Sequence, residues 1–120
     1  MSVSKKPKFE VDVVQDFVGA AHRDVDRVKE MLEEDVDLAN AAVDVGGNFE
    51  TALGGAAHMG RVDIAEALLD KGARMDIFCA AMMGKMAIVK AFIEDDPSVV
   101  HLKGPHGIPL IKHAERRSLR

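Results

Sequence analysis

The chain is poor in the side chains that most often anchor binding partners. Its 120 residues include no tryptophan, no tyrosine and five phenylalanines. Hot spots at protein interfaces and platforms for stacked nucleobases usually rely on Trp, Tyr and Arg. A single cysteine, Cys79, excludes a disulfide framework and a cysteine-based zinc site. A reducing, cytoplasmic setting is therefore expected.

Long hydrophobic runs are absent too. No uncharged stretch approaches the roughly 18 residues that a membrane-spanning helix needs. No apolar segment follows the basic cluster of Lys5, Lys6 and Lys8, as it would in a secretory signal. With 48% hydrophobic and 30% charged residues, the chain has the composition of one compact globular domain. We expect no membrane partner and no export.

An excess of positive charge is missing as well. The formal net charge is −4, and residues 10–50 hold twelve acidic residues against three basic ones. A nucleic-acid-binding protein concentrates basic residues on one face. The charge balance therefore predicts no nucleic-acid partner.

The chain does contain an internal repeat. Three copies begin with a segment of small residues at 19–23, 56–60 and 80–84, and each is followed at the same distance by an apolar segment. The offset between copies is 37 residues and then 24, and a fourth, incomplete copy begins at residue 107. The constant part predicts a pair of helices, and the variable part predicts the connection between pairs.

Local signals place the helix ends. Gly60 and Gly84 stand where the first helix of a pair must stop and turn, a position that suits a positive φ. Arg23 replaces this glycine in the first copy, so we expect a different turn there. Thr51 and Asp76 are expected N-caps for helices that start at residues 52 and 77.

The second copy carries a family pattern. Residues 50–60 read Glu-Thr-Ala-Leu-Gly-Gly-Ala-Ala-His-Met-Gly, and residues 68–73 read Leu-Leu-Asp-Lys-Gly-Ala. This resembles an ankyrin repeat, in which T-P-L-H-x-A-A-x-x-G precedes L-L-x-x-G-A. Ala52 stands in place of the usual Pro and Gly54 in place of the usual His. In the last copy, Pro109 restores the proline.

The resemblance implies an all-α solenoid of about three helix-turn-helix repeats and a C-terminal half-repeat. A flexible basic N-terminus at 1–10 would precede a single domain at 11–120, with repeats at about 11–40, 41–73, 74–100 and 101–120. The resemblance also implies protein recognition without catalysis through a concave groove, as in small stand-alone ankyrin proteins of bacteria.

The unequal spacing predicts a lopsided array. An ankyrin repeat has a period of about 33 residues, so the 37-residue step lengthens the finger at 40–50 ahead of the second repeat. The 24-residue step leaves a tight link at 72–76. One long finger should therefore project beside the second repeat, followed by a gap where the next finger would lie.

The resemblance places the partner-binding residues on the concave side. They are expected at the ends of the inner helices and on the long finger: His22, His58, Met59, Met82, Met83, Asp44, Asn48, Phe49 and Glu50. A methionine-rich, aromatic-poor row suits adaptable apolar contact with a protein segment. Alternatively, one methionine of each pair packs between helices as a gap filler. Phe49 either contacts the partner or forms a lid over the core.

No catalytic residue, cofactor or metal site is expected. The five histidines form no H-x-x-H, H-x-x-x-H or H-E-x-x-H pattern. His22 and His58 are expected about 10 Å apart on successive repeats, at helix-packing distance. Cys79 lies in an expected inner helix, which predicts a buried and inert thiol. The acidic run at 33–37 is expected on a solvated convex face, with a docking patch for a basic partner as the alternative.

The C-terminus leaves an inner helix without an outer helix to cover it. Leu110, Ile111 and Leu119 would then be partly exposed, although terminal repeats normally present a polar face. Either segment 116–120 is a sufficient polar cap, or the natural chain continues, or a second chain covers this end. Self-association through this end is therefore the alternative to binding an unidentified protein partner. A histidine-based metal or catalytic site is the remaining alternative.

Overall fold

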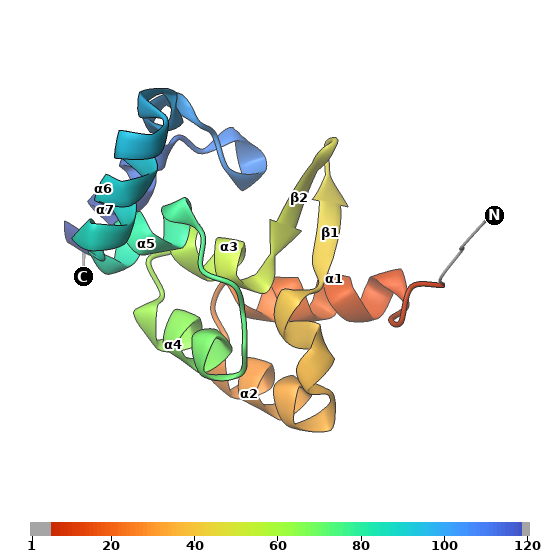
Figure 1. Ribbon diagram of the computed structural model, residues 1–120. Helices are drawn as coiled ribbons and strands as arrows, with labels where there is room; N and C mark the ends of the chain where they lie inside the picture. Colours follow the sequence, from red (N-terminus) through yellow and green to blue (C-terminus); the bar gives the residue numbers. More distant parts are fainter. Residues whose placement is uncertain (1–5, 119–120) are drawn as a thin grey trace.

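The structure is a computed structural model, and it describes residues 6–118. Within this range the chain forms α-helices, one two-stranded sheet and short 3-10 helices (Figure 1). In chain order the elements are α1 (Val11–Ala20), α2 (Val25–Glu34), η1 (Val36–Asn40), β1 (Ala42–Val45), β2 (Asn48–Thr51), α3 (Ala52–His58), α4 (Val62–Asp70), α5 (Ile77–Met83), α6 (Met86–Asp95), η2 (Pro97–His101), η3 (Pro105–Gly107) and α7 (Leu110–Ser118).

The helices associate in pairs, and the pairs lie side by side. α1 packs against α2, α3 against α4, and α5 against α6. The first helices of the pairs and α7 contact one another in the order α1, α3, α5, α7, while α2 contacts α4 (Figure 1). The large side chains at the centre of the core are at most 1% exposed: Phe17, Leu53, Ile64, Leu68 and Met82. This is the helical class that the sequence predicts.

The expected helix ends are confirmed. Thr51 Oγ1 accepts a hydrogen bond from the Gly54 backbone N–H at 3.0 Å, and α3 begins at the next residue. Asp76 caps α5 in the same way. Gly60 and Gly84 have φ values of 68° and 71°, as a left-handed turn requires.

The finger between α2 and α3 is an antiparallel hairpin. Ala42 pairs with Thr51 and Val45 with Asn48, so that two residues, Gly46 and Gly47, form the turn. Both glycines have positive φ, the geometry of the tight turns that suit twisted strands. The structure places no strand between α4 and α5 within the described residues, as the short spacing predicts.

The gap expected beside the hairpin is bridged by the loop that precedes α7. Asn48 Nδ2 donates to the Gly104 carbonyl at 3.4 Å. Pro105 packs beside Gly54, whose missing side chain leaves space for it: a Cβ there would lie 3.5 Å from Pro105 Cγ. The loop residues 104–107 therefore lie against β2 and the start of α3.

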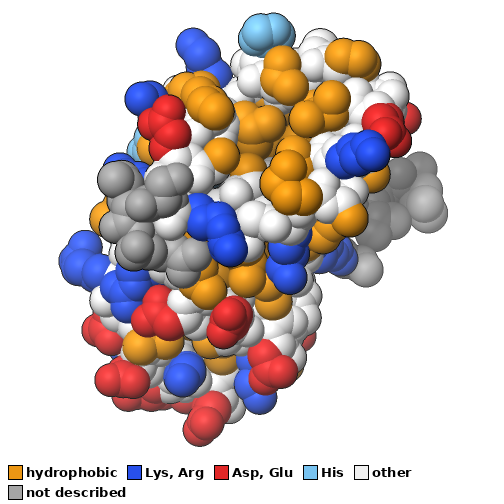
Figure 2. Space-filling model, turned by 90° about the vertical axis from the view of Figure 1, so that its left-hand side faces the viewer, with side chains coloured by type: hydrophobic (Ala, Val, Ile, Leu, Met, Phe, Trp, Pro, Cys, Tyr) orange, Lys and Arg blue, Asp and Glu red, His pale blue; other side chains and the backbone are white. Residues whose placement is uncertain are grey.

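The two ends of the helical array are covered to different degrees. Of the segment expected to be a flexible N-terminus, residues 1–5 lie outside the described part. Residues 6–10 contact the domain, because Lys8 pairs with Asp35 at 3.2 Å and with Asp37, and Phe9 packs against the core. At the other end no side chain of α6 is buried, and hydrophobic side chains gather on this side of the molecule (Figure 2).

Of the apolar residues expected to be partly exposed at α7, one is buried and another is exposed. Leu110 is 6% exposed and packs against α5, whereas Ile111 is 60% exposed. Leu119 lies outside the described residues. Other exposed apolar side chains at this end lie on α6, where Met86 is 68% and Phe92 43% exposed.

Candidate functional site

Three histidines and one glutamate from four different elements converge on one point. His22 follows α1, Glu50 lies on β2, His58 ends α3, and His106 lies in η3. The His22 and His58 Nε2 atoms are 2.9 Å apart, and Glu50 Oε2 lies 3.3 Å and 3.0 Å from them. His106 Nε2 is 3.1 Å from both oxygens of Glu50. We call these four residues the histidine cluster.

Local features of the sequence direct His22 and His106 toward the cluster. A hydrogen bond fixes the ring of His22, because its Nδ1 lies 2.7 Å from the Val18 carbonyl one helical turn earlier. Its ring fits over Gly55, where a Cβ atom would lie 2.6 Å from His22 Cε1. His106 has a φ of 63°, and the glycine after it is also left-handed. Such backbone persists in a non-glycine residue only where its surroundings determine it.

Burial and hydrogen bonding shape the electrostatics of the histidine cluster. Burial alone would raise the pKa of the Glu50 carboxyl. The hydrogen bonds from His22 and His58, with the charges of His22 and His106, outweigh it and hold this pKa far below its usual range. In return, the hydrogen bond to Glu50 raises the pKa of His22. Glu50 is therefore a carboxylate although its side chain is only 4% exposed.

The expected separation of His22 and His58 is wrong. About 10 Å is the distance between packed helix axes, whereas the two ring centroids are 4.7 Å apart because the side chains point toward each other. The centroid of His106 lies 5.2 Å from that of His58. No spacing rule within one helix connects these residues. The feature of the sequence that indicates this contact is Gly55. This glycine lies inside a helix, and the ring of His22 occupies the space that a side chain would fill.

The four residues could hold a metal ion. One ligand atom from each of His22, Glu50, His58 and His106 lies within 4.8 Å of all the others. Among the residues that the structure describes, this is the group that combines histidine and carboxylate ligands at such distances. The expectation of no metal site depended on the absence of histidine ligand motifs and on the distance between His22 and His58, and that distance is wrong.

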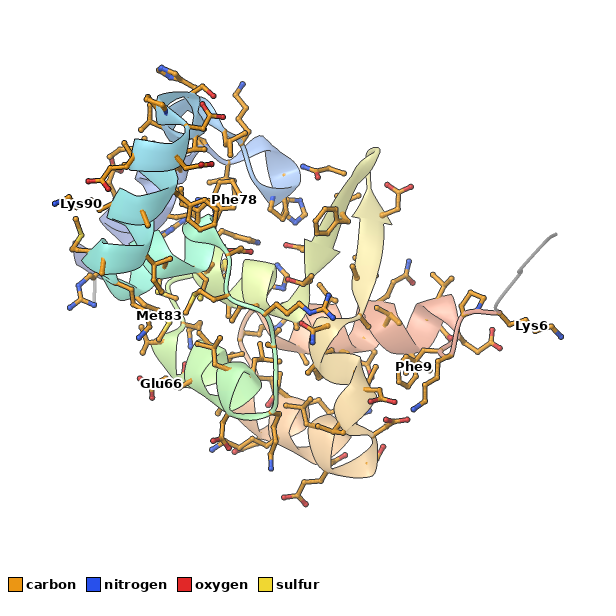
Figure 3. The ribbon with its side chains drawn as sticks, viewed as in Figure 1. Lys6, Phe9, Glu66, Phe78, Met83 and Lys90 are labelled. Carbon is orange, nitrogen blue, oxygen red and sulfur yellow. The ribbon has the colours of Figure 1, made fainter. Side chains whose placement is uncertain are left out.

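Several expected partner contacts lie inside the protein. Met82 is completely buried in the core, which corrects its expected place on the binding surface and agrees with the alternative of a gap filler between helices. Glu50 and His58 are 3% and 8% exposed and face the histidine cluster instead of a partner. Met83 is half-buried at the edge of the core, at the far end of α5 from Phe78 (Figure 3). Met59 alone of the methionines expected here is well exposed, at 45%.

The hairpin carries the most exposed of the expected contact residues. Phe49 is 68% exposed, which corrects the alternative that it forms a lid over the core. Asn48 and Asp44 are also exposed, and Asp44 accepts a hydrogen bond from the Gly47 N–H within the turn. A cleft of about 250 Å³ is lined by the hairpin, α5 and the loop before α7, with Phe49 and Phe78 in its lining.

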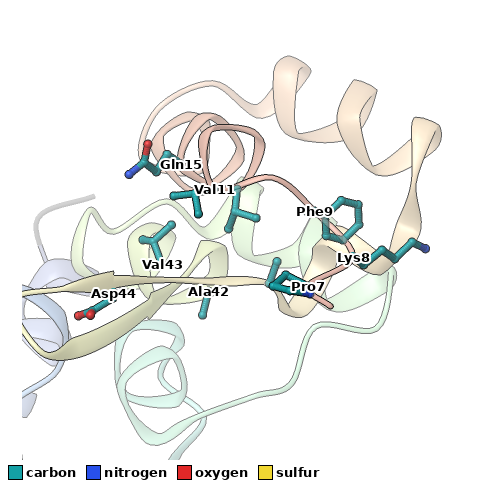
Figure 4. Close-up of a pocket in the computed structure, with 10 residues that line it drawn as sticks. Pro7, Lys8, Phe9, Val11, Gln15, Ala42, Val43 and Asp44 are labelled. Atoms are coloured by element: carbon teal, nitrogen blue, oxygen red, sulfur yellow. The ribbon is translucent and has the colours of Figure 1, made fainter. Parts of the chain in front are cut away.

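A second hollow, of about 430 Å³, lies between the N-terminal segment, α1 and β1 (Figure 4). Its lining is mostly apolar and includes Phe9, Val11 and Val43. The charged groups at its edge are already paired, Lys8 with acidic side chains of the η1 region and Asp44 with the hairpin turn. This hollow marks the place where the N-terminal segment covers the first helix, and we assign no ligand to it.

Two buried titratable groups, Cys79 and His113, are uncharged. Cys79 is fully buried, and burial raises the pKa of its thiol to about 12, so the expected inert thiol is confirmed. His113 on α7 is also fully buried, and its Nδ1 lies 3.0 Å from the Pro109 carbonyl. Burial lowers the pKa of His113, which keeps this imidazole neutral against the ring of Phe78.

The architecture defines a class of protein built from repeated helix pairs. The hairpin, the capped helix α3, the left-handed turn at Gly60 and the helix α4 form one complete unit. Residues 48–79, which span β2, α3 and α4 of that unit, match the family model of the ankyrin repeat. The chain therefore contains an ankyrin repeat at these residues.

The other comparisons add no relative. No curated protein and no solved structure gives a significant match to the chain. Within residues 6–118, none of the helices combines the length and the apolar character needed to cross a membrane.

Proposed function

We propose that the chain is a short ankyrin solenoid that binds a protein partner without catalysis. Three helix pairs and the unpaired α7 form the array, and the hairpin with the ends of the first helices forms the binding surface. Ankyrin repeats are generally protein-interaction modules, and the match at residues 48–79 supports this class of function.

The observation that carries the proposal is the exposed aromatic ring at the edge of a cleft. Phe49 is 68% exposed on a hairpin held by strand pairing on one side and by the Asn48–Gly104 hydrogen bond on the other. Phe78 lines the facing wall of the cleft. A rigid aromatic beside an apolar recess is the arrangement found at the centre of many interfaces, because it buries area at little cost in side-chain entropy.

Phe49→Ser, compared with Phe92→Ser, tests the proposal. Phe92 lies on α6, far along the chain from the hairpin, and is also well exposed at 43%. Both substitutions remove one exposed aromatic ring, so a general loss of surface hydrophobicity affects them equally. We expect wild type and Phe92→Ser to capture the same protein from a lysate of the source organism, and Phe49→Ser to capture at least about tenfold less.

Quantitative mass spectrometry of the captured material provides the measurement, and circular dichroism confirms that both variants are folded. Equal capture by Phe49→Ser and wild type would place the binding surface elsewhere. Capture of no protein above the bead control would remove the proposed class of function.

A second candidate function is self-assembly through the end formed by α6 and α7. One face of α6 lines an open apolar groove of about 510 Å³ that includes Met86, Val89 and Ile93. Exposed apolar surface of this kind marks many interaction sites. Sedimentation equilibrium across a concentration series tests this candidate. A 13.0 kDa species at all concentrations excludes it, and a dimer that Met86→Ser dissociates supports it.

A further inference from the structure

We propose that the histidine cluster is a binding site for one divalent first-row transition-metal ion, with Zn²⁺ as the best-matched ion. His22, His58 and His106 supply three imidazole nitrogens and Glu50 supplies one carboxylate oxygen. Three nitrogens and one oxygen form a ligand set that suits zinc and its neighbours, whereas Ca²⁺ and Mg²⁺ prefer oxygen alone.

Four of the six distances between the ligand atoms are close to those around a tetrahedral ion. Zinc–nitrogen bonds of about 2.0–2.1 Å place two ligand atoms about 3.3 Å apart at the tetrahedral angle. The observed separations are 2.9 Å between the His22 and His58 nitrogens, and 3.0 Å and 3.3 Å from these nitrogens to Glu50 Oε2. His106 Nε2 lies 3.1 Å from the same oxygen. For these four pairs, an ion at the centre requires shifts of a few tenths of an ångström. The nitrogen of His106 lies within 4.8 Å of the nitrogens of His22 and His58.

The hydrogen bond between His22 Nδ1 and the Val18 carbonyl leaves the Nε2 atom of His22 available for a metal. A carbonyl oxygen can only accept, so the 2.7 Å contact with Val18 places a proton on His22 Nδ1. In the neutral ring, the lone pair is then on Nε2, which faces the other ligands. A backbone carbonyl on the second ring nitrogen is the usual partner of a metal-ligating histidine, where it fixes both the tautomer and the orientation of the ring.

A single hydrogen bond joins the two imidazoles, so one Nε2 atom donates and the other accepts. At 2.9 Å, the His22 and His58 Nε2 atoms cannot both carry a proton along the line that joins them. At least one lone pair therefore points into a site that is largely closed to water, since the two side chains are 18% and 9% exposed. A cation at the centre satisfies these lone pairs and the Glu50 carboxylate together.

The fold gives the ion a preformed site close to the solvent. Gly55 leaves space for the ring of His22, and the left-handed backbone at His106 turns that side chain back toward β2. The side chain of His106 is 42% exposed, so it forms the wall between the site and the solvent. The ion would join α1, β2, α3 and η3, which are far apart in the sequence.

The test is metal binding by the full chain and by matched asparagine variants. His106→Asn removes one ligand but keeps a residue type that tolerates the left-handed backbone at this position. His101→Asn removes an exposed histidine of η2, outside the cluster. Each protein is stripped with a chelator and then titrated with Zn²⁺ in competition with a chromogenic chelator, and Co²⁺ is added separately to record its visible spectrum.

We expect one Zn²⁺ per chain for wild type and His101→Asn, and at least about tenfold weaker binding for His106→Asn, since even partners of metal ligands contribute that much. Bound Co²⁺ should give the intense visible bands of a four-coordinate ion in the first two proteins. Zn²⁺ should also raise the melting temperature of these two and not that of His106→Asn. Circular dichroism of the stripped proteins shows whether the variants are folded.

Two results would overturn the proposal. One is a wild-type protein that binds no stoichiometric Zn²⁺ or Co²⁺. The other is a folded His106→Asn variant that binds the ion as tightly as His101→Asn does. The Phe49→Ser variant separates this proposal from the proposed function, because Phe49 is outside the cluster and its replacement should leave Zn²⁺ affinity unchanged.

Discussion

Two adjacent glycines in α3 allow a sharp test of how the histidine cluster is assembled. Gly54 and Gly55 are both buried within the same helix. A Cβ atom at Gly54 would meet its neighbours at 3.5 Å or more, which is ordinary contact. A Cβ atom at Gly55 would lie 2.6 Å from Cε1 and 2.9 Å from Nδ1 of His22, so the ring would have to move.

The two alanine variants should therefore differ in stability in a known direction. Replacing glycine with alanine inside a helix stabilises it by about 0.5–1 kcal/mol, so Gly54→Ala should be as stable as wild type or more so. In Gly55→Ala the same gain is opposed by overpacking, which costs about 1–3 kcal/mol in a well-packed interior. His22 cannot yield freely, because its Nδ1 is bonded to the Val18 carbonyl. We expect Gly55→Ala to be less stable than Gly54→Ala by about 1–3 kcal/mol.

Urea unfolding followed by circular dichroism measures this difference. The slope of the free energy against urea should be the same for both variants, so that the midpoints report stability alone. Stability of Gly55→Ala equal to or above that of Gly54→Ala would refute the argument, because it would mean that the ring of His22 does not occupy the space over Gly55.

Three further predictions follow from single residues. Thr51→Ala removes the N-cap of α3 and should lower the free energy of unfolding by about 1 kcal/mol in the same urea assay, with no change in slope; an unchanged midpoint would count against the cap. Leu68→Ala empties a fully buried site on α4 and should cost about 2–5 kcal/mol by the same measurement, whereas a cost below about 1 kcal/mol would mean that the core closes over it. Burial lowers the pKa of His113 in the folded protein below its ordinary 6.5. As the pH falls, the imidazole is therefore protonated in the unfolded chain before it is protonated in the folded one. The free energy of unfolding consequently decreases as the pH falls below about 6.5. The free energy of unfolding of His113→Leu should therefore fall less than that of wild type between pH 7.5 and pH 5, and parallel losses would contradict the assignment.

The parts of the fold that depend on neighbouring residues could be predicted from the sequence. Thr51, Gly60 and Gly84 act within a few residues of where they stand, through a cap or a left-handed turn, so their roles follow from local chemistry. The unequal repeat spacing likewise located the hairpin at 42–51 and the tight link before α5.

The histidine cluster depends on contacts that no local pattern records. His106 meets Glu50 across 56 residues of chain because a finger is missing after α4 and the later loop bends into its place. The direction of a side chain also mattered more than the position of its helix, since His22 and His58 approach each other from separate helices. Met82 illustrates the same limit: its position in the repeat did not decide between a partner contact and a gap filler between helices, and the structure places it in the core.

The contact between the last loop and the hairpin has a consequence for how the molecule unfolds. In an array of repeats, each unit touches its neighbours, so the ends can fray while the middle stays folded. Here Asn48 and Glu50 of the hairpin are bonded to Gly104 and His106 of the loop that leads into α7. Opening the C-terminal end must therefore break contacts made by the second helix pair. The chain should lose its structure in one cooperative transition, and amide hydrogens of α3 and α7 should exchange through the same opening.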